Sequence, residues 1–171
     1  LLRQVIEMAR RSGEFQRARH LLLTLHYCQL QLGEFRSMRD LEPELRELLT
    51  DYGEVCEVWF DGANGGDGFY GGARESRQID RRTYYDWPNT WQIVRELQPL
   101  AVMFSDGGPD IRWVGNESGE GSGTNWAMLR RAEFAPGISE RKALLEGQRD
   151  GTHWVPAEVD VSIRPGWFYH A

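Results

Sequence analysis

The stretch Val55-Cys56-Glu57-Val58-Trp59-Phe60-Asp61-Gly62 decides the fold that we expect for this chain. It is an almost continuous apolar run that ends in a carboxylate followed by glycines, and a buried parallel strand has this pattern. In α/β barrels, the loops at the carboxyl ends of such strands carry the chemistry. The stretch therefore predicts a parallel strand with Asp61 presented at its end.

Helical patterns surround this strand. Apolar residues recur at helical spacing between Leu45 and Tyr52, which predicts a helix that Asp40 caps, with Pro43 in its first turn. After Asp61, the glycine-rich residues 62–72 predict a long loop, because glycines in this number disfavour any regular element.

The rest of the chain continues this alternation. The pattern predicts a helix from Pro88 to Pro99, a strand at 101–104, an extended piece at 111–114, a helix at 138–146 and a strand at 159–163. Alternating helices and strands favour an α/β fold whose parallel sheet has right-handed crossovers. Such a sheet would gather Asp61, Asp106 and Glu117 at one face.

Composition argues against several classes of partner. The formal net charge is −6 and no basic run is longer than a pair, so we expect no binding to nucleic acid. The longest apolar stretch, around Leu21 to Leu25, is far shorter than the roughly 20 residues that cross a bilayer, so we expect no membrane insertion. The histidines and glycines lack the spacing of a metal site or a phosphate loop, and we expect no metal and no cofactor.

Two carboxylates are the candidates for chemistry. A second acidic cluster, residues 115–120, follows a short apolar strand, and a pair of carboxylates at strand ends is the minimum needed to cleave a glycosidic bond. Asp61 has a second interpretation as a turn residue at the strand exit, which Asp before Gly often is.

The partner carboxylate is harder to choose. Glu117 competes with three other acids, Glu120, Asp106 and Asp110. A general acid needs a raised pKa, which apolar neighbours supply. Tryptophans at positions 113 and 126 flank Glu117, whereas Glu120 lies among glycines, so Glu117 is the better candidate.

Three longer motifs occur in one order along the chain. They are Trp-Phe-Asp-Gly-Ala-Asn-Gly at 59–65, Gly-Pro-Asp-Ile-Arg-Trp-Val-Gly-Asn-Glu at 108–117 and Ser-Ile-Arg-Pro-Gly-Trp-Phe-Tyr-His at 162–170. With these motifs the chain resembles the α-L-fucosidases of glycoside hydrolase family 29, most closely the branch that prefers α-1,3/4-linked fucose. The resemblance implies that residues 44–171 form part of a (β/α)8 TIM barrel, preceded by a helical segment, residues 1–43, that does not match the family.

The resemblance also implies roles for individual residues. Asp61 matches the nucleophile and Glu117 the general acid/base of a retaining hydrolase that releases α-linked L-fucose from an oligosaccharide or glycoconjugate. Five further residues fall in motifs that line the family's sugar site, and their alternative role is to fill the core: Arg112, Trp113, Trp126, Trp167 and Phe168.

The length departs from the family pattern. A TIM barrel needs eight strands, and 171 residues leave no room for all of them, so we expect a fragment that lacks part of the sugar pocket and self-associates through exposed strand edges. The family implies a periplasmic or secreted location, while the chain itself does not indicate one. Two alternatives stay open: a catalytically inactive carbohydrate-binding remnant, and an interaction module built on the helical residues 1–50.

Overall fold

The computed structural model describes residues 38–61, 67–68, 74–76, 78, 80, 83–131, 135–137 and 140–166 of the 171. The chain divides into two compact units, one formed by residues 1–55 and 65–100 and the other by residues 56–64 and 101–171. Most of the predicted helical segment 1–43 and most of the glycine-rich loop lie outside the described residues.

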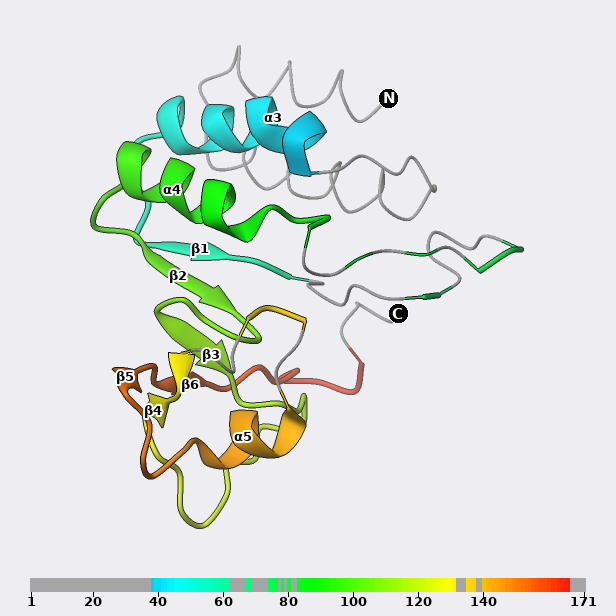
Figure 1. Ribbon diagram of the computed structural model, residues 1–171, viewed down its shortest axis with the longest axis vertical. Coiled ribbons are helices and arrows are strands. Elements are labelled where there is room, and N and C mark those ends of the chain that lie inside the picture. The colour runs from blue at the N-terminus through cyan, green and yellow to red at the C-terminus, as the bar shows by residue number, and fades with distance from the viewer. Residues whose placement is uncertain are drawn as a thin grey trace. The chain divides into compact units, whose positions relative to one another are not determined.

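In the first unit, the described residues form two helices that lie side by side (Figure 1), α3 at Met38–Thr50 and α4 at Trp87–Leu97. Both have an apolar stripe, which buries Leu49 on α3 and Val94 on α4. The two predicted helices are therefore confirmed. The predicted start of the first is wrong, because α3 already includes the residues at positions 40 and 43.

Gln98 ends α4 and ties it to α3. Its side-chain nitrogen donates to the backbone oxygens of Leu49, at 2.6 Å, and Gly53, at 3.1 Å, and its side-chain oxygen accepts from the backbone nitrogen of Val55 at 3.2 Å. Gly53 has a φ of 85°, a left-handed conformation that suits glycine after the last helical turn. One amide side chain thus satisfies three backbone groups where α3 leads towards the strand.

The second unit is built on a four-stranded parallel sheet, in the order β1-β2-β3-β6. Its strands are β1 at Glu57–Trp59, β2 at Val102–Ser105, β3 at Ile111–Trp113 and β6 at Ala157–Glu158. The described residues thereby confirm the predicted parallel α/β sheet. The described part of this unit also contains a short helix, α5 at Arg141–Glu146, and an antiparallel pair, β4 at Met128–Leu129 with β5 at His153–Trp154.

One predicted strand of this sheet is wrong, the one at 159–163, while the pieces predicted at 101–104 and 111–114 are strands. Residues 106–110 join β2 to β3 without a helix, because Asp110 turns the chain back: its carboxylate accepts from the nitrogen of Met103 at 2.8 Å and its nitrogen donates to the Met103 oxygen at 3.1 Å. The last strand lies at Ala157–Glu158 rather than 159–163, where Val161 makes one isolated antiparallel bridge to Ser118.

The sheet has two chemically different faces, because side chains alternate along a strand and paired residues of parallel strands share a face. The register places seven side chains on what we call the acidic–aromatic face, five of them acidic or aromatic: Glu57, Trp59, Phe104, Trp113 and Glu158, with Val102 and Ile111 between them. Adjacent strands lie about 4.8 Å apart, so β1 and β6, at the two edges, would be about 14 Å apart in a flat sheet. The indole nitrogen of Trp59 nevertheless lies 3.0 Å from a carboxylate oxygen of Glu158, which indicates that the sheet curls towards this face.

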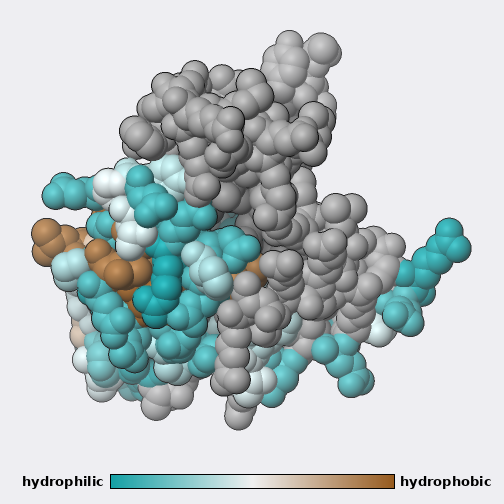
Figure 2. All heavy atoms as spheres, turned by 90° about the horizontal axis from the view of Figure 1, so that it is seen from above, coloured by the Kyte–Doolittle hydropathy of each residue, from teal (hydrophilic) through white to brown (hydrophobic). Residues whose placement is uncertain are grey.

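None of the described helices is long and apolar enough to cross a bilayer. In the view of Figure 2 most of the described residues are hydrophilic, with small hydrophobic areas among them.

The contacts of Gln98 lead to a first prediction. Replacing Gln98 with alanine removes three hydrogen bonds to backbone groups, and we expect this to lower the free energy of unfolding by about 1–3 kcal/mol. Urea denaturation measures the change. Gln92→Ala is the control, because the exposed Gln92 bonds only to Glu96 within α4, and equal midpoints for the two variants would contradict the prediction.

Candidate active site

Asp61 stands just past the end of β1. The backbone nitrogen of Phe60 still donates to the oxygen of Phe104 at 3.0 Å, so the ladder to β2 ends one residue before Asp61. Glu57, Trp59 and Asp61 are spaced two apart, which continues the acidic–aromatic face by sequence position. The Asp61 side chain is exposed, as the sequence pattern predicts for a residue at a strand end.

Glu117 lies in the loop that follows β3, and its neighbour Asn116 folds that loop. The Asn116 side-chain oxygen accepts from the nitrogens of Ser118, at 3.1 Å, and Glu120, at 3.2 Å, while its amide nitrogen donates to the Glu120 oxygen at 2.7 Å. Asn side chains stabilise turns in this way. The loop therefore presents Glu117 on an ordered turn with its side chain exposed.

Glu117 lines a pocket of about 450 Å³, whose other lining residues are Asp106, Trp113, Asn116, Gly137, Arg141 and Leu144. Trp113 lines the pocket, although its indole nitrogen is buried and has no hydrogen-bond partner among the described residues. The pocket thus combines two carboxylates, a guanidinium and an aromatic ring.

The charged residues around the pocket are held by backbone groups. Both carboxylate oxygens of Asp106 accept from the nitrogen of Gly137 at 2.9 Å, and the Arg141 side chain donates to the oxygen of Gly115 at 2.8 Å. Asp106 was predicted to share a face with Glu117, and the two residues do line one pocket. Asp61 is not among the lining residues.

Asp160 is the residue that sequence reasoning missed. Burial raises its pKa above the ordinary value, and the negative charges of Glu117 and Asp61, followed by that of Glu158, raise this pKa further. Both candidate catalytic carboxylates therefore lie within electrostatic range of one acid. The bridge between Ser118 and Val161 gives the geometric reason, since it joins the neighbours of Glu117 and Asp160.

A signal for Asp160 is present in the sequence. Asp160 follows Glu158 by two positions, just as Asp61 follows Trp59, and both pairs lie where a parallel strand ends. This signal was not recognised because the predicted strand at 159–163 placed Asp160 inside a strand, whereas β6 ends at Glu158 and Asp160 follows it.

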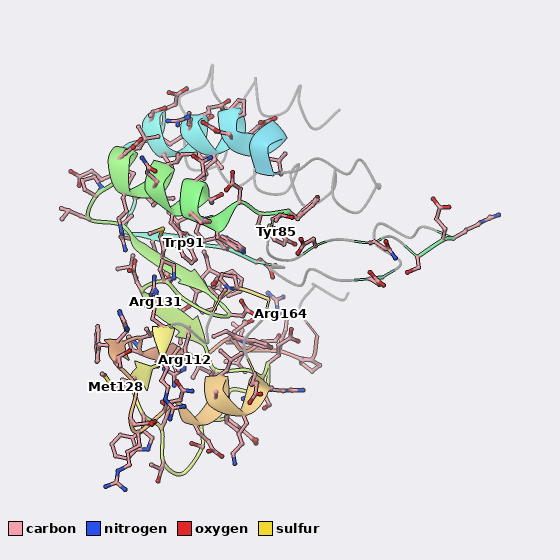
Figure 3. All side chains as sticks on the ribbon, viewed as in Figure 1. Tyr85, Trp91, Arg112, Met128, Arg131 and Arg164 are labelled. Carbon is pink, nitrogen blue, oxygen red and sulfur yellow. The ribbon has the colours of Figure 1, made fainter. Side chains whose placement is uncertain are left out.

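Arg112 lies on the other face of β3, inside the protein. Its side chain has 0% exposure, and Figure 3 shows it among β3, β4 and α5. The guanidinium donates to the backbone oxygens of Leu144, at 3.0 Å, Trp126, at 3.0 Å, and Val155, and to the side-chain oxygen of Asn125 at 2.9 Å. Burial lowers the Arg112 pKa, although arginine stays charged in proteins. Arg112 therefore holds loops together here, and no described pocket exposes it to a ligand.

The remaining predicted binding residues lie elsewhere. Trp126 is 41% exposed and does not line the pocket, and the guanidinium carbon of Arg149 lies 6.0 Å from the centre of its ring. Trp167 and Phe168 lie outside the described residues, so their predicted role stays a prediction. In the part of the chain that the structure describes, no cluster of three His, Cys, Asp or Glu residues is arranged to hold a metal ion.

Known proteins resemble this arrangement in sequence and fold. Over 129 residues the chain is 46% identical to "Alpha-L-fucosidase 1" of Arabidopsis thaliana, a match that covers 75% of this chain and 23% of that protein. It also matches the crystal structure of a glycoside hydrolase 29 family member from an unknown rumen bacterium, with 53% identity and a TM-score of 0.66 over 78% of this chain and 24% of that one. The chain is related to the α-L-fucosidases of glycoside hydrolase family 29. No family model matches it.

The relation to the fucosidases supports the resemblance read from the three motifs, at the level of the family. The chain spans about a quarter of the length of either relative. Its four parallel strands agree with the α/β fold of the glycoside hydrolase 29 relative.

The buried guanidinium leads to a second prediction. Arg112→Met would leave the oxygens of Leu144, Val155 and Trp126 without their donor, and we expect a loss of about 3 kcal/mol or more in the free energy of unfolding. Urea denaturation tests this. The matched control is Arg149→Met, since Arg149 is exposed and such substitutions change stability by only about 0.5 kcal/mol. Similar midpoints for both variants would refute the structural role of Arg112.

Proposed function

We propose that this chain carries both catalytic carboxylates of a retaining α-L-fucosidase, with Asp61 as the nucleophile and Glu117 as the general acid/base. The observation that carries the proposal is the position of both residues in one unit, Asp61 directly after β1 and Glu117 on the ordered turn after β3, with the charges of both raising the pKa of Asp160. The names of the relatives supply the substrate class, an α-linked L-fucoside. In a retaining glycosidase both carboxyl groups act at one anomeric carbon, and for this reason they lie about 5–5.5 Å apart.

The reaction follows from these roles in two steps. Asp61 attacks the anomeric carbon while the Glu117 carboxyl gives its proton to the leaving oxygen, which forms a fucosyl ester of Asp61 and frees the leaving group. Glu117, now a carboxylate, takes a proton from water, and the resulting oxygen attacks the same carbon. This releases fucose with its original anomeric configuration and regenerates both groups.

The leaving oxygen is proposed to lie at the pocket beside Glu117, because this pocket adjoins the proposed acid. Trp113 lines the same pocket, which supports the proposal that its ring contacts the sugar. Trp126 and the residues at 167 and 168 are proposed to bind the sugar through apolar contacts, and a preference for α-1,3/4 linkages belongs to the same proposal. Arg112 is proposed to support sugar binding indirectly: its buried guanidinium holds the segments at Trp126 and Leu144 in place and does not contact the sugar.

A carbohydrate-binding remnant without activity is the competing function. It would need the aromatic residues but neither carboxylate. The electrostatic grouping of Asp61, Glu117 and Asp160 favours the enzyme, because placing like charges together is costly and is common at catalytic sites.

Substitution of the two carboxylates tests the function. With 4-nitrophenyl α-L-fucopyranoside as substrate, we expect Asp61→Asn to lower kcat by more than about 10³-fold. We expect Glu117→Gln to lower kcat/KM for a fucosyl disaccharide by about 10²- to 10⁴-fold, because a sugar leaving group needs the proton. Glu120→Gln is the matched control on the same loop, as its side chain is exposed. Fucose binding by an unaltered chain that shows no turnover would favour the remnant.

The stereochemistry of the product gives an independent prediction. Two displacements at one carbon preserve its configuration, so the first fucose released should be the α-anomer. Proton NMR of the anomeric signals during the first minutes of hydrolysis measures this. An initial excess of the β-anomer would show a single displacement and would exclude Asp61 as a covalent nucleophile.

A further inference from the structure

One hydrogen bond joins the two edge strands of the parallel sheet. The indole nitrogen of Trp59 on β1 donates to a carboxylate oxygen of Glu158 on β6 at 3.0 Å. Two strands, β2 and β3, lie between them in the sheet. The contact therefore spans the concave side of the curled sheet rather than following the ladder.

Trp59 is fixed by a second contact as well. Its ring stacks on that of Phe104, with centroids 4.2 Å apart and planes 10° apart, and Phe104 is buried. Stacking holds the plane of the ring, while the bond to Glu158 sets how the ring is turned within that plane. Asp61 follows Trp59 by two residues, and Phe60 between them makes the last ladder bond.

Glu158 also acts on a second residue of β1. Burial raises the pKa of Glu57, and the charge of Glu158 and a hydrogen bond with it raise this pKa further. One oxygen of Glu57 is buried with no partner among the described residues. Glu158 thus contacts β1 at Glu57 and Trp59, both on the acidic–aromatic face and both upstream of Asp61.

We propose that Glu158 is a positioning residue for Asp61: by accepting the indole hydrogen of Trp59 across the curled sheet, it fixes the end of β1 from which Asp61 reaches the substrate. This inference rests on the proposed function of Asp61 as the nucleophile. Glu158 itself touches neither substrate nor reacting atoms in this role. Because nucleophilic attack demands accurate placement, a displacement of about 1 Å is enough to cost on the order of 10²-fold in rate.

A double-mutant cycle tests the coupling between the two side chains. Trp59→Phe keeps an aromatic ring but removes the donor, and Glu158→Ala removes the acceptor. We expect each change to lower kcat/KM for 4-nitrophenyl α-L-fucopyranoside about tenfold, and the double variant to be no worse than either single one, because all three lose the same bond. Glu158→Gln should keep activity within about threefold, since its amide oxygen still accepts the hydrogen bond.

The controls separate positioning from a general loss of structure. Glu120→Ala, on the exposed loop, should leave kcat/KM unchanged within about twofold. The inhibition constant of free fucose should stay within about threefold in every variant, because misplacing the nucleophile affects attack more than binding. A double variant about 100-fold slower, or equal losses in Glu158→Gln and Glu158→Ala, would overturn the proposal.

A spectroscopic measurement keeps the inference testable even if the chain has no fucosidase activity. In protein labelled with ¹⁵N-tryptophan, the indole signal that disappears in Trp59→Phe belongs to Trp59. Glu158→Ala should speed solvent exchange of this hydrogen by about tenfold or more, whereas Glu158→Gln should change it much less. An unchanged exchange rate of the Trp59 indole hydrogen in Glu158→Ala would refute the hydrogen bond between Trp59 and Glu158, whatever the activity of the unaltered chain. If this hydrogen bond is present but the chain does not hydrolyse the fucoside, only the proposed function is refuted.

Discussion

The buried guanidinium of Arg112 is the constraint around which the second unit is organised. It donates to backbone oxygens from three separate segments, at Trp126 before β4, at Leu144 in α5 and at Val155 before β6. Short elements cannot hold one another by packing area alone, since β4 and β6 have two residues each and α5 has six. The guanidinium of Arg112 has several donors in a fixed plane, and its hydrogen bonds connect elements that packing alone would not hold. Several carbonyl oxygens, rather than one carboxylate, accept these bonds.

Arg112 also explains how one strand serves two purposes. Neighbouring residues on β3 point to opposite faces, so Arg112 is directed into the loops and Trp113 into the pocket that Glu117 lines. A shift of one residue in the pairing of β3 would exchange these two side chains. The pairing of Trp113 with Glu158 therefore fixes two things at once: Arg112 points into the interior of the unit, and Trp113 and Glu158 lie on the acidic–aromatic face.

The sequence predicts much of this structure where its pattern is local. The apolar spacing before Gly53 correctly indicates α3, because burial of one stripe leaves a periodic trace. The run that leads to Asp61 correctly indicates a parallel strand, but the prediction that this strand is buried is wrong, since Trp59 is 39% exposed. The role of Arg112 leaves no such trace, since its acceptors lie up to 43 residues away and all but the side chain of Asn125 are backbone oxygens that any residue supplies. The motif that contains Arg112 was therefore assigned to sugar binding from resemblance, while the side chain lies in the interior. The β2–β3 connection escaped prediction for a related reason, because Asp110 replaces a crossover helix through two bonds to a single residue.

Two carboxyl groups near the candidate site make the stability of the fold depend on pH. The pKa of Glu57 and that of Asp160 are both raised in the folded chain, above ordinary values of 4.5 and 3.8, so folding favours their protonated forms. Any stability that these groups contribute is complete below those ordinary values and is lost as the pH rises through the raised ones. Near neutral pH the fold holds a group of acids that repel one another, and bonds such as the one from Trp59 to Glu158 offset part of this repulsion. Grouped acids with raised pKa values are common at catalytic sites, so the raised pKa values of Glu57 and Asp160 agree with the acid–base chemistry proposed for this end of the sheet.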